Sequence, residues 1–162
     1  MHRPRSFNCL SVKQFYLYYN HAMVLSPHSS SPMIPTPLGA PTILVVDDDE
    51  LNRDLISRQL QRAGLSASTA ESGEVAMRSA LEQPPQLALI DLHLGGWSGY
   101  ETVTQFLAKP SLAHIIFFAI SASETEQVVA KTKAAGFHAF FPKPLDFELL
   151  ISAIRQALSS PP

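Results

Sequence analysis

The sequence predicts an α/β fold, a doubly wound parallel sheet of five strands with five helices on its two faces. Short apolar runs alternate along the chain with longer segments in which apolar residues recur at helical spacing. The runs are nearly continuous, which is typical of strands buried on both faces. Strands that alternate with helices in this way lie parallel and are joined by right-handed crossovers.

The first elements follow each other from residue 42 onward. TILVVDD, residues 42–48, is a strand, and the helix over 51–64 ends at Gly64, because glycine readily adopts the left-handed conformation that ends helices. Helical spacing places one set of apolar residues of this helix on a single face, which we expect to be buried: Leu51, Leu55, Ile56, Leu60 and Ala63. LSASTA, residues 65–70, is a weaker second strand.

The later elements have clearer limits. Ser72 is a candidate N-cap for a helix over 72–83, which Pro84 and Pro85 would end. The remaining predicted strands are LALID (87–91), IIFFAIS (115–121) and AFFP (139–142). Helices are predicted over 98–107, over 123–136 up to Gly136, and after a possible cap at Asp146, with Phe147, Leu150, Ile151, Ile154 and Leu158 at core spacing.

Composition and charge exclude several classes of protein. Hydrophobic residues are 46% and charged residues 16%, as in globular domains, and no apolar run has the roughly 18 residues of a membrane span. The single cysteine, Cys9, provides no disulfide framework and favours a reducing compartment, so we expect a cytoplasmic protein. Residues 41–162 carry a formal charge of −5, so we expect no nucleic-acid partner, because phosphates are bound by Lys and Arg.

Residues 1–40 differ from the rest of the chain. They carry a formal charge of +3, show no sustained period and lead into the Pro/Ser-rich stretch SPHSSSPMIPTPLGAP. Lys13 and Gln14 interrupt any secretory signal. We expect a disordered extension here, followed by one domain over 41–160, and Met33 is an alternative start of the protein.

Polar residues follow four of the five predicted strands. They are Asp47, Asp48 and Asp49 after the first strand, then Asp91, Ser121 and Lys143 at the ends of the third, fourth and fifth. Ligands of open parallel sheets bind beyond the carboxyl ends of the strands. Crowded carboxylates repel one another unless a cation is present, and an oxygen-only site suits Mg²⁺. The pattern predicts a carboxylate that accepts a phosphoryl group, with a lysine and a hydroxyl near its oxygens.

Each of these residues has a simpler interpretation when taken alone. Acidic residues are common at helix starts, and an aspartate such as Asp91 is an ordinary turn residue. A serine or a lysine at a strand end is most often structural. The DDDE run lacks the glycine and the distant glutamate of a calcium loop. Their joint position at the ends of the appropriate strands is what favours a functional site.

The chain from about Thr42 to Leu158 resembles the receiver domain of bacterial response regulators. The resemblance rests on the motifs ILVVDDDELNR, LALIDLHLGGWSGYE, AISAS and FFPKPL. The spacing agrees with the family, since Asp91 and Ser121 are 30 residues apart and Ser121 and Lys143 are 22 apart. The resemblance implies a flavodoxin-like fold with strand order 2-1-3-4-5.

The resemblance also implies roles for individual residues. Asp91 would accept a phosphoryl group from a phosphohistidine of a sensor histidine kinase or a histidine phosphotransfer protein. The Mg²⁺ ligands would be Asp48 and Asp91 directly, Asp47 through water, and the backbone carbonyl of His93. Ser121 would donate a hydrogen bond to the acyl phosphate, and Lys143 would form an ion pair with it.

A conformational switch is implied as well. Ser121 would move toward the phosphoryl group and Phe140 would rotate inward, which changes the face formed by the fourth helix, fifth strand and fifth helix for a downstream protein partner. The Lys143–Pro144 bond would be cis. The sequence departs from the family at Leu94-Gly95, where receivers usually have Met-Pro. Two consecutive glycines make that loop more flexible.

Several kinds of protein fit this reading. We expect a signalling receiver of the single-domain type and not an enzyme, because only SSPP follows the last helix. The alternatives are a receiver fragment of a hybrid histidine kinase and a pseudo-receiver that binds partners without phosphorylation. A metal-dependent phosphatase with its nucleophile in the Asp47–Asp49 motif fits less well, because Asp91 lies on another strand and the chain is too short for a cap domain.

Overall fold

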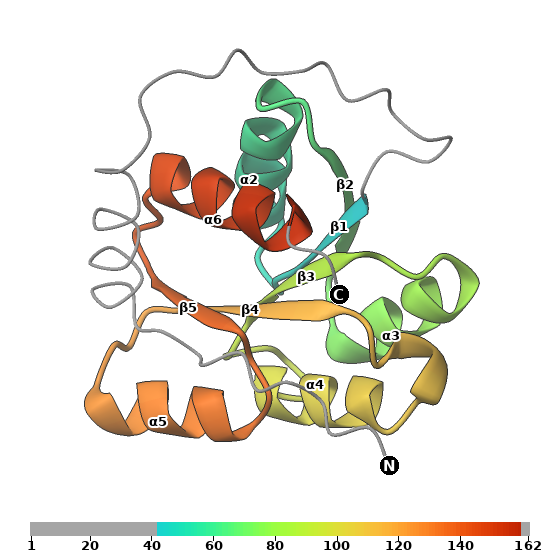
Figure 1. Cartoon of the computed structure of the whole chain (residues 1–162). Coiled ribbons are helices and arrows are strands. Elements are labelled where there is room, and N and C mark those ends of the chain that lie inside the picture. Colours follow the sequence, from blue (N-terminus) through green and yellow to red (C-terminus); the bar gives the residue numbers. More distant parts are fainter. Residues whose placement is uncertain (1–41, 160–162) are drawn as a thin grey trace.

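The computed structural model describes residues 42–159. The predictions for residues 1–40, including the disordered extension and the start at Met33, lie outside the described residues. Within the described part, five parallel strands form one sheet in the order β2-β1-β3-β4-β5, with five α-helices and one short 3₁₀ helix (Figure 1). The predicted fold class and strand order are therefore confirmed.

The elements alternate along the chain as predicted. The strands are β1 (Thr42–Val46), β2 (Ser66–Ala70), β3 (Leu87–Asp91), β4 (Ile116–Ser121) and β5 (Ala139–Pro142). The helices are α2 (Glu50–Arg62), α3 (Gly73–Glu82), α4 (Gly99–Leu107), α5 (Glu126–Ala134) and α6 (Phe147–Ser159), with the 3₁₀ helix η1 over Pro110–Leu112. Among these helices, none combines the length and apolar character needed to cross a membrane.

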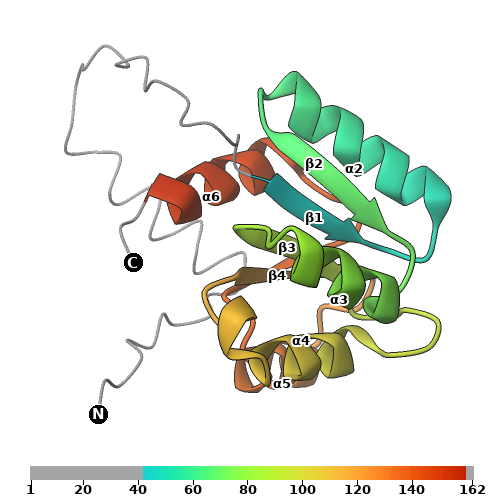
Figure 2. The same ribbon diagram turned by 90° about the vertical axis from the view of Figure 1, so that its right-hand side faces the viewer.

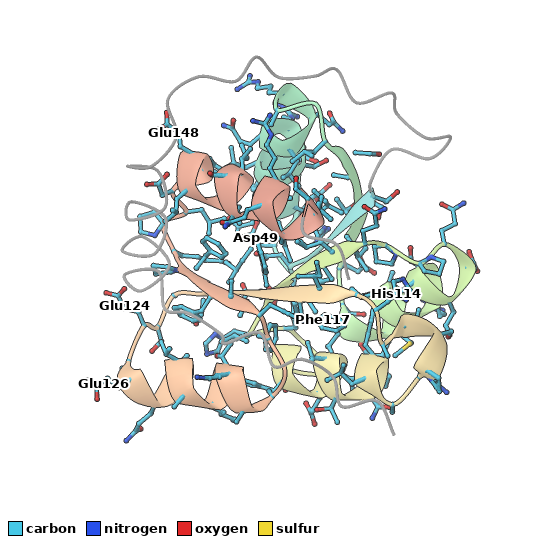
Figure 3. All side chains as sticks on the ribbon, in the orientation of Figure 1. Asp49, His114, Phe117, Glu124, Glu126 and Glu148 are labelled. Atoms are coloured by element: carbon cyan, nitrogen blue, oxygen red, sulfur yellow. The ribbon has the colours of Figure 1, made fainter. Side chains whose placement is uncertain are left out.

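The sheet separates two hydrophobic cores. On one face α2 and α6 pack against the strands, and Ile56, Leu60 and Ile154 are fully buried there. On the other face α3, α4 and α5 cover the sheet, as Figures 1 and 2 show. Phe117 of β4, labelled in Figure 3, lies in this second core. Its ring packs edge to face with that of Phe106 of α4, at 5.7 Å between ring centroids. Consecutive residues of β1, β3, β4 and β5 thus enter opposite cores, which explains their continuous apolar runs.

The ends of the helices have local causes. The Ser72 side chain accepts a hydrogen bond from the Val75 N–H at the start of α3, and the Asp146 side chain accepts one from the Leu149 N–H at α6. Gly64 and Gly136 follow α2 and α5 with φ of 75° and 100°, a conformation that favours glycine. The predicted caps at Ser72 and Asp146 are therefore present.

One prediction about the core is wrong. Leu51 and Leu55 were expected on the buried face of α2, but they are 79% and 48% exposed. Leu51 and Leu55 lie four residues apart on one stripe of the helix, and Ile56 and Leu60 lie four residues apart on another. The sheet and α6 cover only the stripe with Ile56 and Leu60.

Candidate functional site

The register of the parallel strands brings the polar strand ends to one edge of the sheet. Asp91 closes β3 and pairs with Ile120, the residue before Ser121 on β4. Ser121 pairs with Pro142, and Lys143 follows directly on β5, where its N–H donates to the Ser121 carbonyl at 2.8 Å. Asp47 follows the last residue of β1. The parallel topology itself therefore assembles these groups.

The centre of the cluster is a lysine between two buried aspartates. Asp47 and Asp91 are 1% and 5% exposed. Lys143 Nζ donates to Asp47 Oδ2 at 2.9 Å and to Asp91 Oδ2 at 2.5 Å. Burial alone would lower the pKa of Lys143, but its hydrogen bonds and charge interactions with Asp91 and Asp47 raise it above the usual lysine value. The ammonium therefore stays charged at neutral pH and balances part of the carboxylate charge.

The other carboxylate oxygens are held by backbone groups. Asp49 N–H donates to Asp47 Oδ1 at 2.9 Å, and His93 N–H donates to Asp91 Oδ1 at 2.8 Å. Arg53 Nη1, from the second turn of α2, donates to the Asp47 carbonyl at 2.7 Å. Both carboxylates are thus fixed in orientation, so they need little rearrangement to bind a cation or to react.

Three carboxylates lie close enough to share a cation. Asp47, Asp48 and Asp91 each offer one oxygen, and these oxygens lie within 4.8 Å of one another. Asp48 is exposed and reachable from solvent, whereas the other two are buried. A donor set made only of oxygen atoms fits Mg²⁺, which keeps several waters. Asp49 is not part of this group, because its side chain caps α2 by accepting from Leu51 N–H and Asn52 N–H.

The two residues expected to respond to phosphorylation lie on β4 and β5. Ser121 is fully buried and its Oγ accepts a hydrogen bond from Ser123 N–H at 3.1 Å. Phe140 is 2% exposed and packs in the core under α3, α4 and α5. The Lys143–Pro144 bond is cis.

The imidazole of His93 is exposed to solvent beside Asp91. Its side chain is 71% exposed, and Nδ1 lies 4.0 Å from Asp91 Oδ1, beyond hydrogen-bond length. Its backbone N–H is the group that contacts Asp91, by donating to Oδ1 at 2.8 Å. The role of its carbonyl as a metal ligand stays a prediction.

Arg53 is a residue of the site that the sequence reasoning missed. It lies inside the motif ILVVDDDELNR, but its contact is with a backbone carbonyl six residues earlier. No repeating pattern marks such a contact. The only available signal was a cation placed one turn after the acidic run.

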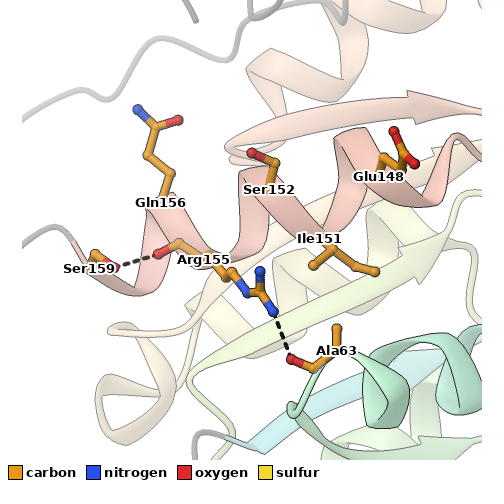
Figure 4. Close-up of a pocket in the computed structure, with 7 residues that line it drawn as sticks. All are labelled: Ala63, Glu148, Ile151, Ser152, Arg155, Gln156 and Ser159. Carbon is orange, nitrogen blue, oxygen red and sulfur yellow. Dashed lines mark hydrogen bonds between the residues drawn. The ribbon is translucent and has the colours of Figure 1, made fainter. Parts of the chain in front are cut away.

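A surface cavity of about 590 Å³ lies elsewhere, between α6 and the C-terminal end of α2 (Figure 4). Ile151 and Arg155 of α6 line it together with Ala63, and Arg155 Nη2 donates to the Ala63 carbonyl at 2.8 Å. Asp49 caps the other end of α2. The cavity therefore lies far along that helix from the acidic cluster and takes no part in the candidate site.

Comparison with known proteins gives one family. The sequence model of the response regulator receiver domain matches residues 43–155. The chain is 36% identical over 118 residues to a cyclic di-GMP phosphodiesterase of Thermotoga maritima, a match that covers 72% of this chain and 31% of that protein. It is 27% identical over 117 residues to the polar-differentiation response regulator DivK of Brucella ovis, covering 72% of this chain and 95% of DivK.

The solved structures show the same fold. The chemotaxis response regulator CheY4 of Vibrio cholerae superimposes with a TM-score of 0.69 at 22% identity, over 74% of this chain and 99% of that one. The chain spans about a third or less of the length of the first curated relatives it matches, but nearly all of DivK.

Proposed function

The chain belongs to the response regulator receiver family, and from that membership we propose that it accepts a phosphoryl group on Asp91 from a phosphohistidine. Receiver domains are signalling modules of two-component systems. The observation that carries the proposal is the buried pair of Asp47 and Asp91 bridged by the Lys143 ammonium. The donor is a sensor histidine kinase or a histidine phosphotransfer protein.

The transfer is a displacement at phosphorus. An Asp91 carboxylate oxygen forms the new bond to phosphorus, and the bond from phosphorus to the donor imidazole nitrogen breaks. The electron pair of the broken bond stays on that nitrogen. Because the other ring nitrogen of the donor carries a proton, the ring leaves as a neutral imidazole. The product is an acyl phosphate on Asp91. Its oxygens would be held by Lys143 and by the Ser121 hydroxyl, which lies at the end of the neighbouring strand.

The residues present fit a Mg²⁺ ion. Asp48 and Asp91 would hold it directly, and Asp47 through water, with the His93 carbonyl as a further ligand. When bound, Mg²⁺ neutralises negative charge that develops on the transferring phosphoryl oxygens. The chain's own contribution is to fix the two buried carboxylates through backbone N–H groups, so that Asp91 is oriented before the donor arrives.

Phosphorylation would change the conformation of residues on β4 and β5. An acyl phosphate adds negative charge and acceptor oxygens beside Ser121. Movement of Ser121 toward those oxygens would alter the packing of Phe140. Phe140 lies in the second core on β5, two strands away from Asp91 on β3. The surface formed by α5, β5 and α6 would then change for a downstream protein partner.

The metal requirement gives a direct test. Wild-type protein incubated with radiolabelled acetyl phosphate should incorporate about one label per chain, and the label should depend on Mg²⁺. Asp48→Asn should need at least about tenfold more Mg²⁺ to reach the same rate of phosphorylation, because an exposed ligand of the ion is lost. Asp54→Asn removes a carboxylate from the exposed side of α2 and should behave as wild type. Equal Mg²⁺ dependence of Asp48→Asn and wild type would contradict the proposed metal site.

A further inference from the structure

We infer that Glu74 of α3 is a positioning residue for the phosphoryl and metal site, an inference that rests on the proposed function. It would act through the acceptor loop, by which we mean residues 92–98 between β3 and α4. This loop leaves Asp91 directly and contains the backbone of His93. Figure 2 shows α3 and α4 together on the face of the sheet beside this loop.

The two ends of the acceptor loop are fixed by the scaffold. Leu92 N–H donates to the Ile120 carbonyl at 3.0 Å, and Gly99 N–H donates to the Leu92 carbonyl at 3.2 Å. At the far end Ser98 and Glu101 form a reciprocal capping box at the start of α4. The middle holds Gly95 and Gly96, and glycines leave a backbone free to take many conformations.

Glu74 fastens this middle part from outside the loop. Its Oε1 accepts a hydrogen bond from Trp97 N–H at 3.3 Å, across 23 residues of sequence. A Cβ atom on Gly96 would lie 2.9 Å from the same oxygen, so the carboxylate rests directly against the Gly96 backbone, where φ is 79°. The Trp97 side chain packs against the core next to this contact.

The first turn of α3, which carries Glu74, is tightly packed. Ser72 caps α3. A Cβ on Gly73 would lie 2.1 Å from Thr102 Oγ1 and 3.2 Å from Trp97 Cβ. The first turn of α3 therefore fits tightly against the acceptor loop and α4. The backbone N–H of Glu74 lowers the pKa of its own carboxyl, and hydrogen bonds from Ser72 and Trp97 add to this. The group is therefore a charged acceptor at neutral pH.

The contact links α3 to the groups at the site. His93 N–H holds Asp91 Oδ1 at 2.8 Å, and the carbonyl of the same residue is the proposed metal ligand. If Glu74 no longer holds Trp97, the glycines of the acceptor loop are released and the His93 peptide samples more positions. The expected result is weaker Mg²⁺ binding with little change in the maximal rate of phosphoryl acceptance.

Amide hydrogen exchange of the full chain tests the contact without any metal or phosphoryl donor. Glu74→Ala should speed exchange in residues 92–98, and Glu74→Gln should restore slow exchange, because its amide oxygen can still accept from Trp97 N–H. Glu82→Ala, at the exposed C-terminal end of α3, removes the same charge and should match wild type. Unchanged exchange in Glu74→Ala would overturn the inference.

The Mg²⁺ dependence of phosphorylation by acetyl phosphate tests the consequence. The Mg²⁺ concentration for half-maximal rate should rise about fivefold in Glu74→Ala, the effect of one lost hydrogen bond, and return to near wild type in Glu74→Gln. Faster loop exchange with an unchanged Mg²⁺ requirement would also overturn the inference. A wild type that takes no phosphoryl group at any Mg²⁺ concentration would instead refute the proposed function, and with it the role of Glu74.

Discussion

Lys143 makes the stability of the protein depend on pH in a defined direction. Its pKa is raised in the folded state, chiefly through Asp91 and Asp47 and against the effect of burial. The folded protein therefore binds the ammonium proton more tightly than the unfolded chain does. The resulting stabilisation is complete below the ordinary lysine pKa of 10.5 and is lost as pH rises through the higher folded-state value.

We therefore expect Lys143→Met to be less stable than wild type at neutral pH, because Asp47 and Asp91 then face each other without a cation. The difference in unfolding free energy should shrink above about pH 10.5. Urea unfolding in EDTA at a series of pH values measures it. Lys133→Met, on the exposed side of α5, is the matched control and should follow wild type. Parallel curves for Lys143→Met and wild type over the whole range would contradict the ion-pair account.

At the scale of elements, α2 carries exposed apolar side chains next to the site. Leu51 lies in the first turn after the Asp49 cap, and Leu55 lies one turn further. Exposed leucines of this kind favour contact with a protein partner. Because they lie beside the acidic cluster, we propose that they contact the protein that would deliver the phosphoryl group to Asp91.

The double substitution Leu51→Ser, Leu55→Ser should therefore separate two kinds of phosphoryl donor. Transfer from a phosphorylated histidine phosphotransfer protein should slow by about tenfold, because apolar contact with the donor is lost. The rate with acetyl phosphate should not change, because the carboxylates are untouched. Leu81→Ser, a similarly exposed leucine near the end of α3, should leave both rates unaltered. Equal slowing with both donors would mean that the leucines act on the site and not on docking.

The limits of sequence prediction are visible in the same helix. Continuous apolar runs located four of the five strands, whereas β2, with the sequence SASTA, gave a weaker signal. Polar cap residues such as Ser72 and Asp146 located helix starts, because these signals are local. Helix α2 has two apolar stripes, and only its packing against the sheet and α6 decides which is buried. Arg53 and Glu74 were missed for a related reason. Their contacts depend on where a helix lies across the sheet, which no local pattern specifies.

At the scale of the whole molecule, one topological rule positions the chemistry. Parallel strands in the order β2-β1-β3-β4-β5 place Asp47, Asp91, Ser121 and Lys143 at one edge. Because that edge follows from strand direction, the sequence was sufficient to predict which groups lie near each other. The assignment of residues 41–160 as the receiver and 1–40 as an extension stays a prediction. Within the described residues, both cores are built by the segment from Ile43 to Leu158.

The central claim is that Asp91 accepts one phosphoryl group. Intact-protein mass after incubation with acetyl phosphate and Mg²⁺ tests it most directly, with wild type compared to Asp91→Asn. The account predicts the mass gain of a single phosphoryl group in wild type, no gain in Asp91→Asn, and no gain in wild type when EDTA is present. Folded wild type without any gain, or an equal gain in Asp91→Asn, would contradict it.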